Sequence, residues 1–152
     1  MLNKLLVIIS FILLTVEVFP QQSGFGAGII LGEPTGFSLK YSLSENNAFD
    51  FALGYSFTQK NNRFHLTIDH LWFNYSLINS SEKLPFFYGI GARIKTHESD
   101  DASFGVRGVF GLAWFPHNVP IDVFIQVAPV FKFIPGTGVD LDAGIGVRYF
   151  FN

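Results

Sequence analysis

The chain has 152 residues, a formal net charge of -2 and no cysteine, and 14% of its residues are charged whereas 49% are hydrophobic and 17% aromatic. Soluble domains have a charged share of about 25%, so this chain has too few charges to cover an ordinary water-exposed surface. The charge balance excludes the basic field that recruits nucleic acid. The lack of cysteine excludes disulfides, thiolate metal sites and a lipid anchor on cysteine. The length predicts one domain.

The first 23 residues are predicted to be a secretory signal peptide, with residues 24–152 as the mature domain. A weakly positive start that ends at Lys4 is followed by a continuous apolar run of 12 residues, Leu5–Val16, and by a polar exit that begins at Glu17. This order is typical of an export signal. The run is shorter than the about 20 residues of a membrane-spanning helix, and an uncleaved anchor helix is the alternative. We expect cleavage between Gln21 and Gly24, although no typical cleavage pattern is present.

Eight strands are predicted beyond residue 24, separated by turns that contain Gly, Pro, Asn or charged residues. Successive side chains on a strand point to opposite faces, and in these segments apolar or aromatic residues alternate with small, polar or charged ones. Pro129 interrupts the seventh strand and is expected to cost one hydrogen bond of the sheet. In chain order the predicted strands are Phe25–Leu31, Phe37–Ser44, Ala48–Thr58, Phe64–Leu77, Phe86–Thr96, Phe104–Phe115, Ile121–Ile134 and Val139–Asn152.

The fourth predicted strand has an irregular pattern. Its apolar face begins at Phe64, but His70 falls on that face and Leu71 falls on the other. A β-bulge near Asp69–His70 would shift the phase; alternatively, the strand leaves the membrane before its end. The second interpretation is preferred, because it keeps Trp72 in an outward position.

The polar faces of these strands predict an inside-out barrel. Eight strands of roughly ten residues fit the span of a tilted transmembrane strand, and only helices and closed barrels satisfy their main chain in lipid. We therefore predict an all-β fold, an eight-stranded antiparallel up-and-down transmembrane β-barrel. Its interior is expected to hold an ion-pair network of six basic and five acidic residues: Lys40, Asp50, Asp69, Arg93, Lys95, Arg107, Asp122, Lys132, Asp140, Asp142 and Arg148.

Aromatic residues at the strand ends support the same orientation. An even number of strands places both termini on one side, the periplasmic side of an outer membrane. Nearly every strand then has an outward aromatic residue near that side, as in the aromatic girdle of membrane barrels. The predicted girdle consists of Phe25, Tyr41, Phe49, Trp72, Tyr88, Trp114, Tyr149 and Phe151.

Four segments carry a resemblance to known proteins: GAGIILGEPTGFSLKYSLSENNAFDFALGYSF, FYGIGARIK, FGVRGVFGLAWFP and DLDAGIGVRYFF. They resemble a family of small, mostly uncharacterised outer-membrane β-barrel proteins found in spirochaetes and other Gram-negative-type bacteria, similar in architecture to OmpA/OmpX-type barrels. The resemblance covers essentially all of the mature chain and implies a location in the bacterial outer membrane. It implies no agreed activity, although a spirochaetal member is associated with binding a host complement regulator.

The resemblance also suggests partners. The closing stretch from Val139 to Phe151 is similar to the C-terminal signal that the barrel-assembly machinery recognises, with Phe151 as the aromatic end and Asn152 as a departure from it. The other expected partners are outer-membrane lipid around the barrel and a host or extracellular protein at the loops.

The first functional hypothesis is a structural or surface-interaction barrel without catalytic residues, cofactor or metal, and a monomer. A barrel of eight strands is just wide enough for side chains to fill, so the charged residues should plug it and no general porin activity is expected. The predicted extracellular loops are short: 32–36, 59–63, 97–103 and 135–138. The acidic residues of loop 98–101 have oxygen ligands for a divalent cation, but a solvated charged loop is the simpler interpretation.

Two alternatives belong to other classes. A lipid-modifying outer-membrane enzyme needs a nucleophile, a base and an orienting acid, and the densest polar cluster is His65, Thr67, Asp69 and His70 on the fourth strand. No serine is placed obviously beside it. A narrow channel is the other alternative, and the near balance of interior charge argues against a strongly selective pore.

Overall fold

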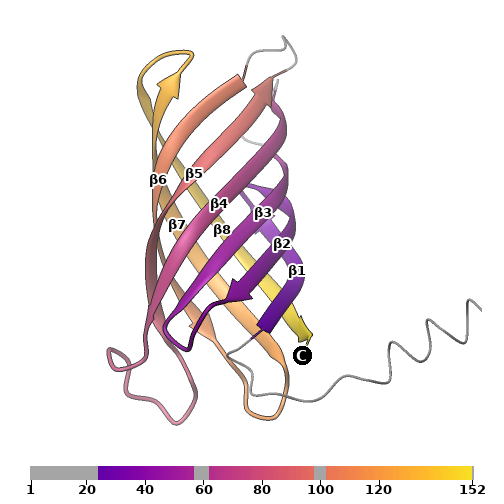
Figure 1. Cartoon of the computed structure of the whole chain (residues 1–152), viewed down its shortest axis with the longest axis vertical. Coiled ribbons are helices and arrows are strands. Elements are labelled where there is room, and N and C mark those ends of the chain that lie inside the picture. Colours follow the sequence, from indigo (N-terminus) through magenta and orange to yellow (C-terminus); the bar gives the residue numbers. More distant parts are fainter. Residues whose placement is uncertain (1–23, 57–61, 98–101, 152) are drawn as a thin grey trace, which may run out of the picture.

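The computed structural model describes residues 24–56, 62–97 and 102–151, and these form one closed barrel of eight antiparallel strands (Figure 1). Each strand pairs with the next, and β8 closes the barrel on β1, which confirms the predicted all-β, eight-stranded fold. The predicted signal peptide and the acidic loop 98–101 lie outside the described residues. The strands are β1 Gly24–Gly32, β2 Thr35–Ser42, β3 Asn47–Tyr55, β4 Asn62–Asn74, β5 Phe86–His97, β6 Ala102–Trp114, β7 Ile121–Ile134 and β8 Gly138–Phe151.

Alternation along each strand separates an interior face from an outer face. On β3, Ala48 and Asp50 are at most 3% exposed, whereas Phe49 and Tyr55 are 39% and 62% exposed. The outer face carries most of the large apolar side chains and the interior carries the charges, which is the reverse of a soluble barrel. Among the described residues, no helix is long and apolar enough to cross a membrane.

The irregular pattern of β4 has a simple structural origin. The pairing of β4 with β3 runs without a shift from Trp72 to His65, so the alternative of a bulge near Asp69–His70 is wrong. Trp72 points outward at 36% exposure, as predicted, whereas Leu71 and Phe73 point into the barrel. Because the interior residues near the end of this strand are apolar, the sequence looks as if its alternation had shifted by one residue, although the strand has no such shift.

In Figure 1, β1 begins and β8 ends at the same end of the barrel. Aromatic side chains close the interior at that end. Their rings come from five strand ends, and each residue is at most 8% exposed. They pack together in one apolar cluster, which separates the charged interior from solvent on this side. We call these five rings the aromatic plug: Phe73, Phe87, Phe115, Phe124 and Phe150.

The strands differ in length around the barrel. β1, β2 and β3 have 9, 8 and 9 residues, whereas β4 to β8 have 12 to 14. At the end opposite the termini, two residues join β1 to β2 and residues 135–137 join β7 to β8, so these loops are short as expected. The connection from β4 to β5, residues 75–85, lies at the end of the termini and is longer.

Candidate functional site: the charged interior

The structure places all eleven residues of the predicted ion-pair network on the interior face. Nine of them are at most 5% exposed, and the side chains of Lys132 and Asp140 are 28% and 24% exposed near the end opposite the termini. Burial of this many charges requires partners, because an unpaired buried charge is very costly. The contacts fall into three groups that follow one another along the barrel.

The first group lies above the aromatic plug and centres on Arg148. Its Nε and Nη2 donate to the two carboxylate oxygens of Asp122 at 2.9 and 3.1 Å, and its Nη1 donates to Asp50 and, at 3.3 Å, to the Ser38 hydroxyl. Lys40 donates to the same Asp122 at 3.2 Å. This bidentate geometry is the strong form of a charge-assisted hydrogen bond.

Both cations of this group also contact the aromatic plug. The Lys40 ammonium lies 4.1, 4.9 and 5.5 Å from the ring centres of Phe73, Phe115 and Phe150. The Arg148 guanidinium lies 4.0 Å from the centre of the Phe124 ring. Such contacts are attractive because the ring face is negative. The aromatic plug therefore stabilises the two cations in addition to shielding them from solvent.

The second group joins the five strands β4, β5, β6, β7 and β8. Arg107 donates to both oxygens of Asp69 at 2.9 Å and to Asp142 at 3.1 Å. Arg93 donates to Asp142 at 2.8 Å and to Asp140 at 2.6 Å, and Lys132 lies 3.3 Å from Asp140. Asp142 therefore links two guanidinium groups from neighbouring strands.

A glycine between two charged residues makes the Asp69–Arg107 pair possible. Asp69, Gly91 and Arg107 stand in one row across β4, β5 and β6. A side chain at Gly91 would overlap the Asp69 carboxylate and the main chain of Ile68. Because Gly91 has none, the charged side chains meet across the strand that separates them.

The third group lies toward the end opposite the termini and includes two ionisable residues that the predicted network did not contain. Glu33 is 6% exposed and accepts from Lys95 at 3.0 Å and from the Ser56 hydroxyl at 2.6 Å. The fully buried His65 ring has Nδ1 3.7 Å from Glu33 and Nε2 3.6 Å from Asp142. With Glu33, the interior contains six acidic residues and six Lys or Arg residues among those that the structure describes.

The alternation pattern could not have revealed Glu33. It falls in the turn after Gly32, and strict alternation from the outward Phe25 would place position 33 on the outer face. The turn breaks that alternation and directs the carboxylate inward. The only sequence signal was an acidic residue beside a proline in a tight turn.

The candidate catalytic cluster of β4 is divided between the two faces. His65, Thr67 and Asp69 point inward, but Asp69 is held by Arg107 rather than by His65. His70 lies on the other face, where its ring is 5.1 and 4.4 Å from those of Phe49 and Trp72. No hydroxyl of the described residues forms a hydrogen bond with either ring nitrogen of His65, so this geometry does not assemble a nucleophile, a base and an orienting acid.

Little free space reaches the network from the end of the termini. A hollow that borders Lys40, Tyr75 and Phe115 has a volume of about 10 Å³, which is room for about one water molecule. Ion pairs and the aromatic plug fill the interior above it, so the described residues leave no evident passage for a solute on this side.

The eight residues of the predicted aromatic girdle all point outward, with exposures between 36% and 52%. They lie close to the end of the barrel where the termini are. Neighbours make ring contacts, with 6.4 Å between the centres of Phe25 and Phe151 and 5.9 Å between those of Trp72 and Tyr88. The rings therefore form a band around one end of the outer surface.

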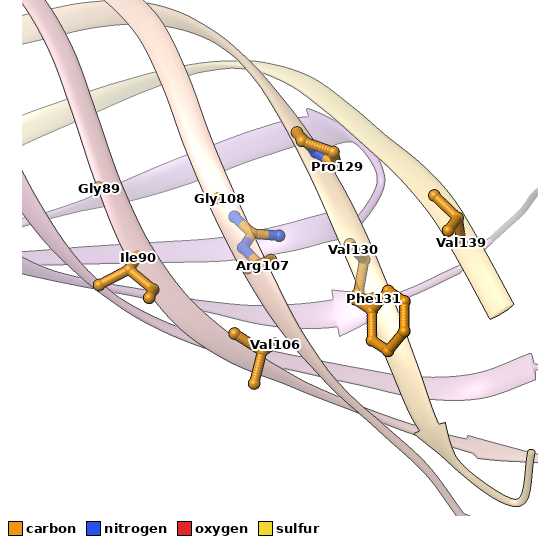
Figure 2. A pocket seen from close by; sticks show the side chains of 9 residues that line it. All are labelled: Gly89, Ile90, Val106, Arg107, Gly108, Pro129, Val130, Phe131 and Val139. Atoms are coloured by element: carbon orange, nitrogen blue, oxygen red, sulfur yellow. The ribbon is translucent and has the colours of Figure 1, made fainter. Parts of the chain in front are cut away.

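A hollow of about 380 Å³ lies in the outer wall where β6 meets β7 (Figure 2). Gly108 leaves an outward position without a side chain, and the pairing of the two strands passes from Arg107–Val130 to Phe110–Val127 around Pro129. The lining is mostly apolar and consists of Gly89, Ile90, Val106, Arg107, Gly108, Pro129, Val130, Phe131 and Val139.

Comparisons with family models, with curated proteins and with solved structures find no match for this chain. Among the described residues, no group of three or more His, Asp or Glu side chains is arranged to hold a metal ion. Ideas about function therefore rest on the two faces of the barrel and on the charged interior.

Proposed function

We propose that this chain is an integral β-barrel of the bacterial outer membrane with a structural or surface-interaction role, and that its interior ion pairs close the lumen. One observation carries the proposal, the inverted distribution of polarity. Arg107 and Arg148 are at most 2% exposed, whereas Phe37 and Val139 are 68% and 72% exposed. An apolar surface that continues around a barrel is unfavourable in water and favourable in lipid.

The aromatic band supplies a boundary for the proposed membrane. Tyr and Trp prefer the level of lipid headgroups, so we take the band, at the end of the termini, as the proposed headgroup level. The termini then face the periplasm, and the β1–β2 and β7–β8 turns face the outside. The strands β4 to β8, with 12 to 14 residues, are long enough to cross an outer membrane when tilted, since about 9 to 11 residues suffice.

The filled interior favours a structural role over transport. Removal of a buried charge from its partner costs several kcal/mol, so the three groups of ion pairs resist the separation that a conducting pore would need. The lipid-modifying enzyme and the narrow channel are not supported by a specific contact. Proposed partners are outer-membrane lipid, the barrel-assembly machinery through Val139–Phe151, and an extracellular protein at the loops, with the barrel itself a monomer.

The deciding experiment combines cell fractionation with electrophoresis of unboiled and boiled protein. A closed membrane barrel resists detergent, so the unboiled protein should be found with the outer membrane and should migrate differently from the boiled chain. A protein that is recovered in the soluble periplasm and migrates identically with and without boiling would contradict the proposal. The variant Gly136→Ala, at a site with no atom within 4 Å of an added methyl group, is a matched control for expression.

A further inference from the structure

Among the strands that the structure describes, none pairs with one edge of β8 in its upper part, residues 138–142, and we call this the open edge. β1 pairs with β8 from Phe25–Phe151 to Gly32–Gly144, and one further hydrogen bond joins the Glu33 nitrogen to the Ala143 oxygen at 2.8 Å. Beyond it, residues 138–142 of β8 pair with β7 on one side and with no described strand on the other. Figure 1 shows the same asymmetry, because the orange and yellow β7–β8 hairpin reaches the upper end of the barrel whereas β1 and β2 lie in its lower part.

Main-chain groups along this edge point toward the vacant side. Successive residues of an antiparallel strand direct their N–H and C=O groups to alternate sides. Since Ala143 directs its carbonyl to β1, Leu141 and Val139 direct their main-chain groups the same way. Leu141 and Val139 are 68% and 72% exposed, which with Phe37 at 68% are the highest exposures among the large hydrophobic residues of the described chain.

The edge lies among exposed apolar residues of the outer surface. Val139 is paired with Phe131, and the outward residues Phe131, Phe133 and Ile134 of the neighbouring strand are all apolar and exposed. An unpaired N–H or C=O group in hydrocarbon costs several kcal/mol. This cost rests on the proposed membrane location, but the open edge itself does not. The outward residues of the edge are also apolar rather than the lysines or prolines that usually blunt an edge strand.

A second barrel is poorly shaped to cover this edge. Strands of a membrane barrel are tilted by about 35 to 45°, and two barrels side by side present their facing strands with opposite tilt. The strands would cross at roughly twice that angle and could not form a ladder. An extended polypeptide segment can instead adopt the tilt of β8 and continue the wall.

We propose that the edge of β8 from Gly138 to Asp142 is a docking site for an extended segment of another polypeptide, which adds to the barrel wall as an antiparallel strand. Main-chain hydrogen bonds supply the affinity in this mode of recognition, and alternate side chains supply the specificity. The inward Asp140 and Asp142 already contact arginines, so the segment should alternate apolar outward residues with small polar inward ones. In the proposed orientation it arrives from outside the cell.

A tethered peptide tests the edge directly. The chain has no cysteine, so Thr137→Cys at the exposed β7–β8 turn gives a single attachment site. An eight-residue peptide of alternating Val and Ser is linked through a C-terminal cysteine, which sets it antiparallel to β8. Tethering raises the effective concentration to the millimolar range. Amide hydrogen exchange of Val139 and Leu141 is then measured by NMR in detergent micelles.

We expect both amides to exchange fast before attachment. After attachment, their exchange rates should be at least about tenfold lower. A peptide with N-methyl groups on the residues facing β8 cannot form the ladder and should leave exchange fast. Slow exchange before attachment, or no protection by the unmodified peptide, would overturn the proposal.

Two variants separate main-chain pairing from side-chain contact. Leu141→Ala keeps the N–H group and should retain protection of Val139, whereas Leu141→Pro removes that group and should lose it. Equal loss of Val139 protection in both variants would contradict pairing through the main chain. The shift in migration between unboiled and boiled protein verifies that each variant folds. If Leu141→Pro does not fold, the comparison between the unmodified and the N-methylated peptide tests pairing through the main chain instead. Failure of the membrane proposal would be seen in fractionation, independently of these exchange rates.

Discussion

Arg148 and Asp122 are direct cross-strand neighbours on β8 and β7, and they are joined by two parallel hydrogen bonds of 2.9 and 3.1 Å. Both residues are at most 2% exposed. The guanidinium also reaches Asp50 on β3, and it does so past the glycine of β1 that stands beside Arg148, Gly28. One side chain thereby ties together strands from both sides of the closure between β8 and β1.

Arg148→Ala should destabilise the barrel strongly. The change leaves the carboxylate of Asp50 without its arginine and leaves Asp122 with Lys40 alone. Removal of one partner from a buried ion pair typically costs about 3 to 5 kcal/mol. Urea unfolding in lipid vesicles, followed by the loss of the electrophoretic shift, measures the change in free energy.

Lys132→Ala is the matched control for that experiment. Its pair with Asp140 is partly exposed, and Asp140 keeps Arg93 as a partner. The loss should be below about 1 kcal/mol, as for other solvent-accessible pairs. Equal stability of the Arg148→Ala variant and the unmodified protein would show that the ion pairs do not hold the barrel together.

Gly91→Ala should be among the least tolerated glycine changes in the wall. The added methyl group would overlap the Asp69 carboxylate and the main chain of Ile68, and it would separate Asp69 from Arg107. We expect a loss of at least about 3 kcal/mol, because both strain and a broken buried pair contribute. Gly136→Ala, where an added methyl group has nothing within 4 Å, should be neutral in the same unfolding assay. A neutral Gly91→Ala would contradict the row of Asp69, Gly91 and Arg107.

Alternation predicted which residues face inward, because a period of two is a property of the extended backbone. It placed Lys40 and Arg107 correctly on the interior face of their strands without knowledge of their partners. The partners depend on how far each strand is shifted against its neighbours, and no single strand contains that information. Arg107 therefore meets Asp69 two strands away, and the sequence pattern offered no means to pair them.

Alternation was misleading at two kinds of position: where apolar residues face the interior, and where a residue lies in a turn. Leu71 and Phe73 are apolar but belong to the aromatic plug and its surroundings, so they imitated a change of phase in β4. Glu33 enters the interior from a turn, where alternation has no meaning. Both cases need the closed barrel before the position of the side chain can be understood.

The two tryptophans provide a test of the proposed membrane boundary. Trp72 and Trp114 are 36% and 41% exposed on the outer surface at the end of the termini, and aromatic residues of a girdle lie at headgroup level. In Trp72→Phe and Trp114→Phe, the remaining tryptophan should be quenched more by lipids brominated near the headgroup than by lipids brominated near the chain end. Both variants should report the same depth. Quenching by aqueous iodide without quenching by either lipid would contradict a girdle.

Reconstituted barrels should show no porin-sized permeability. The aromatic plug and the network above it fill the interior, and the hollow next to Lys40 holds only about 10 Å³, about one water molecule. Liposomes that contain the unmodified protein should therefore not swell in isotonic solutions of small sugars. Phe73→Ala removes one ring of the plug and should cost about 3 to 5 kcal/mol in stability without producing swelling, because the ion pairs remain above it. Rapid swelling with the unmodified protein would show that the lumen is open, and the role of the interior charges would then be to line a passage.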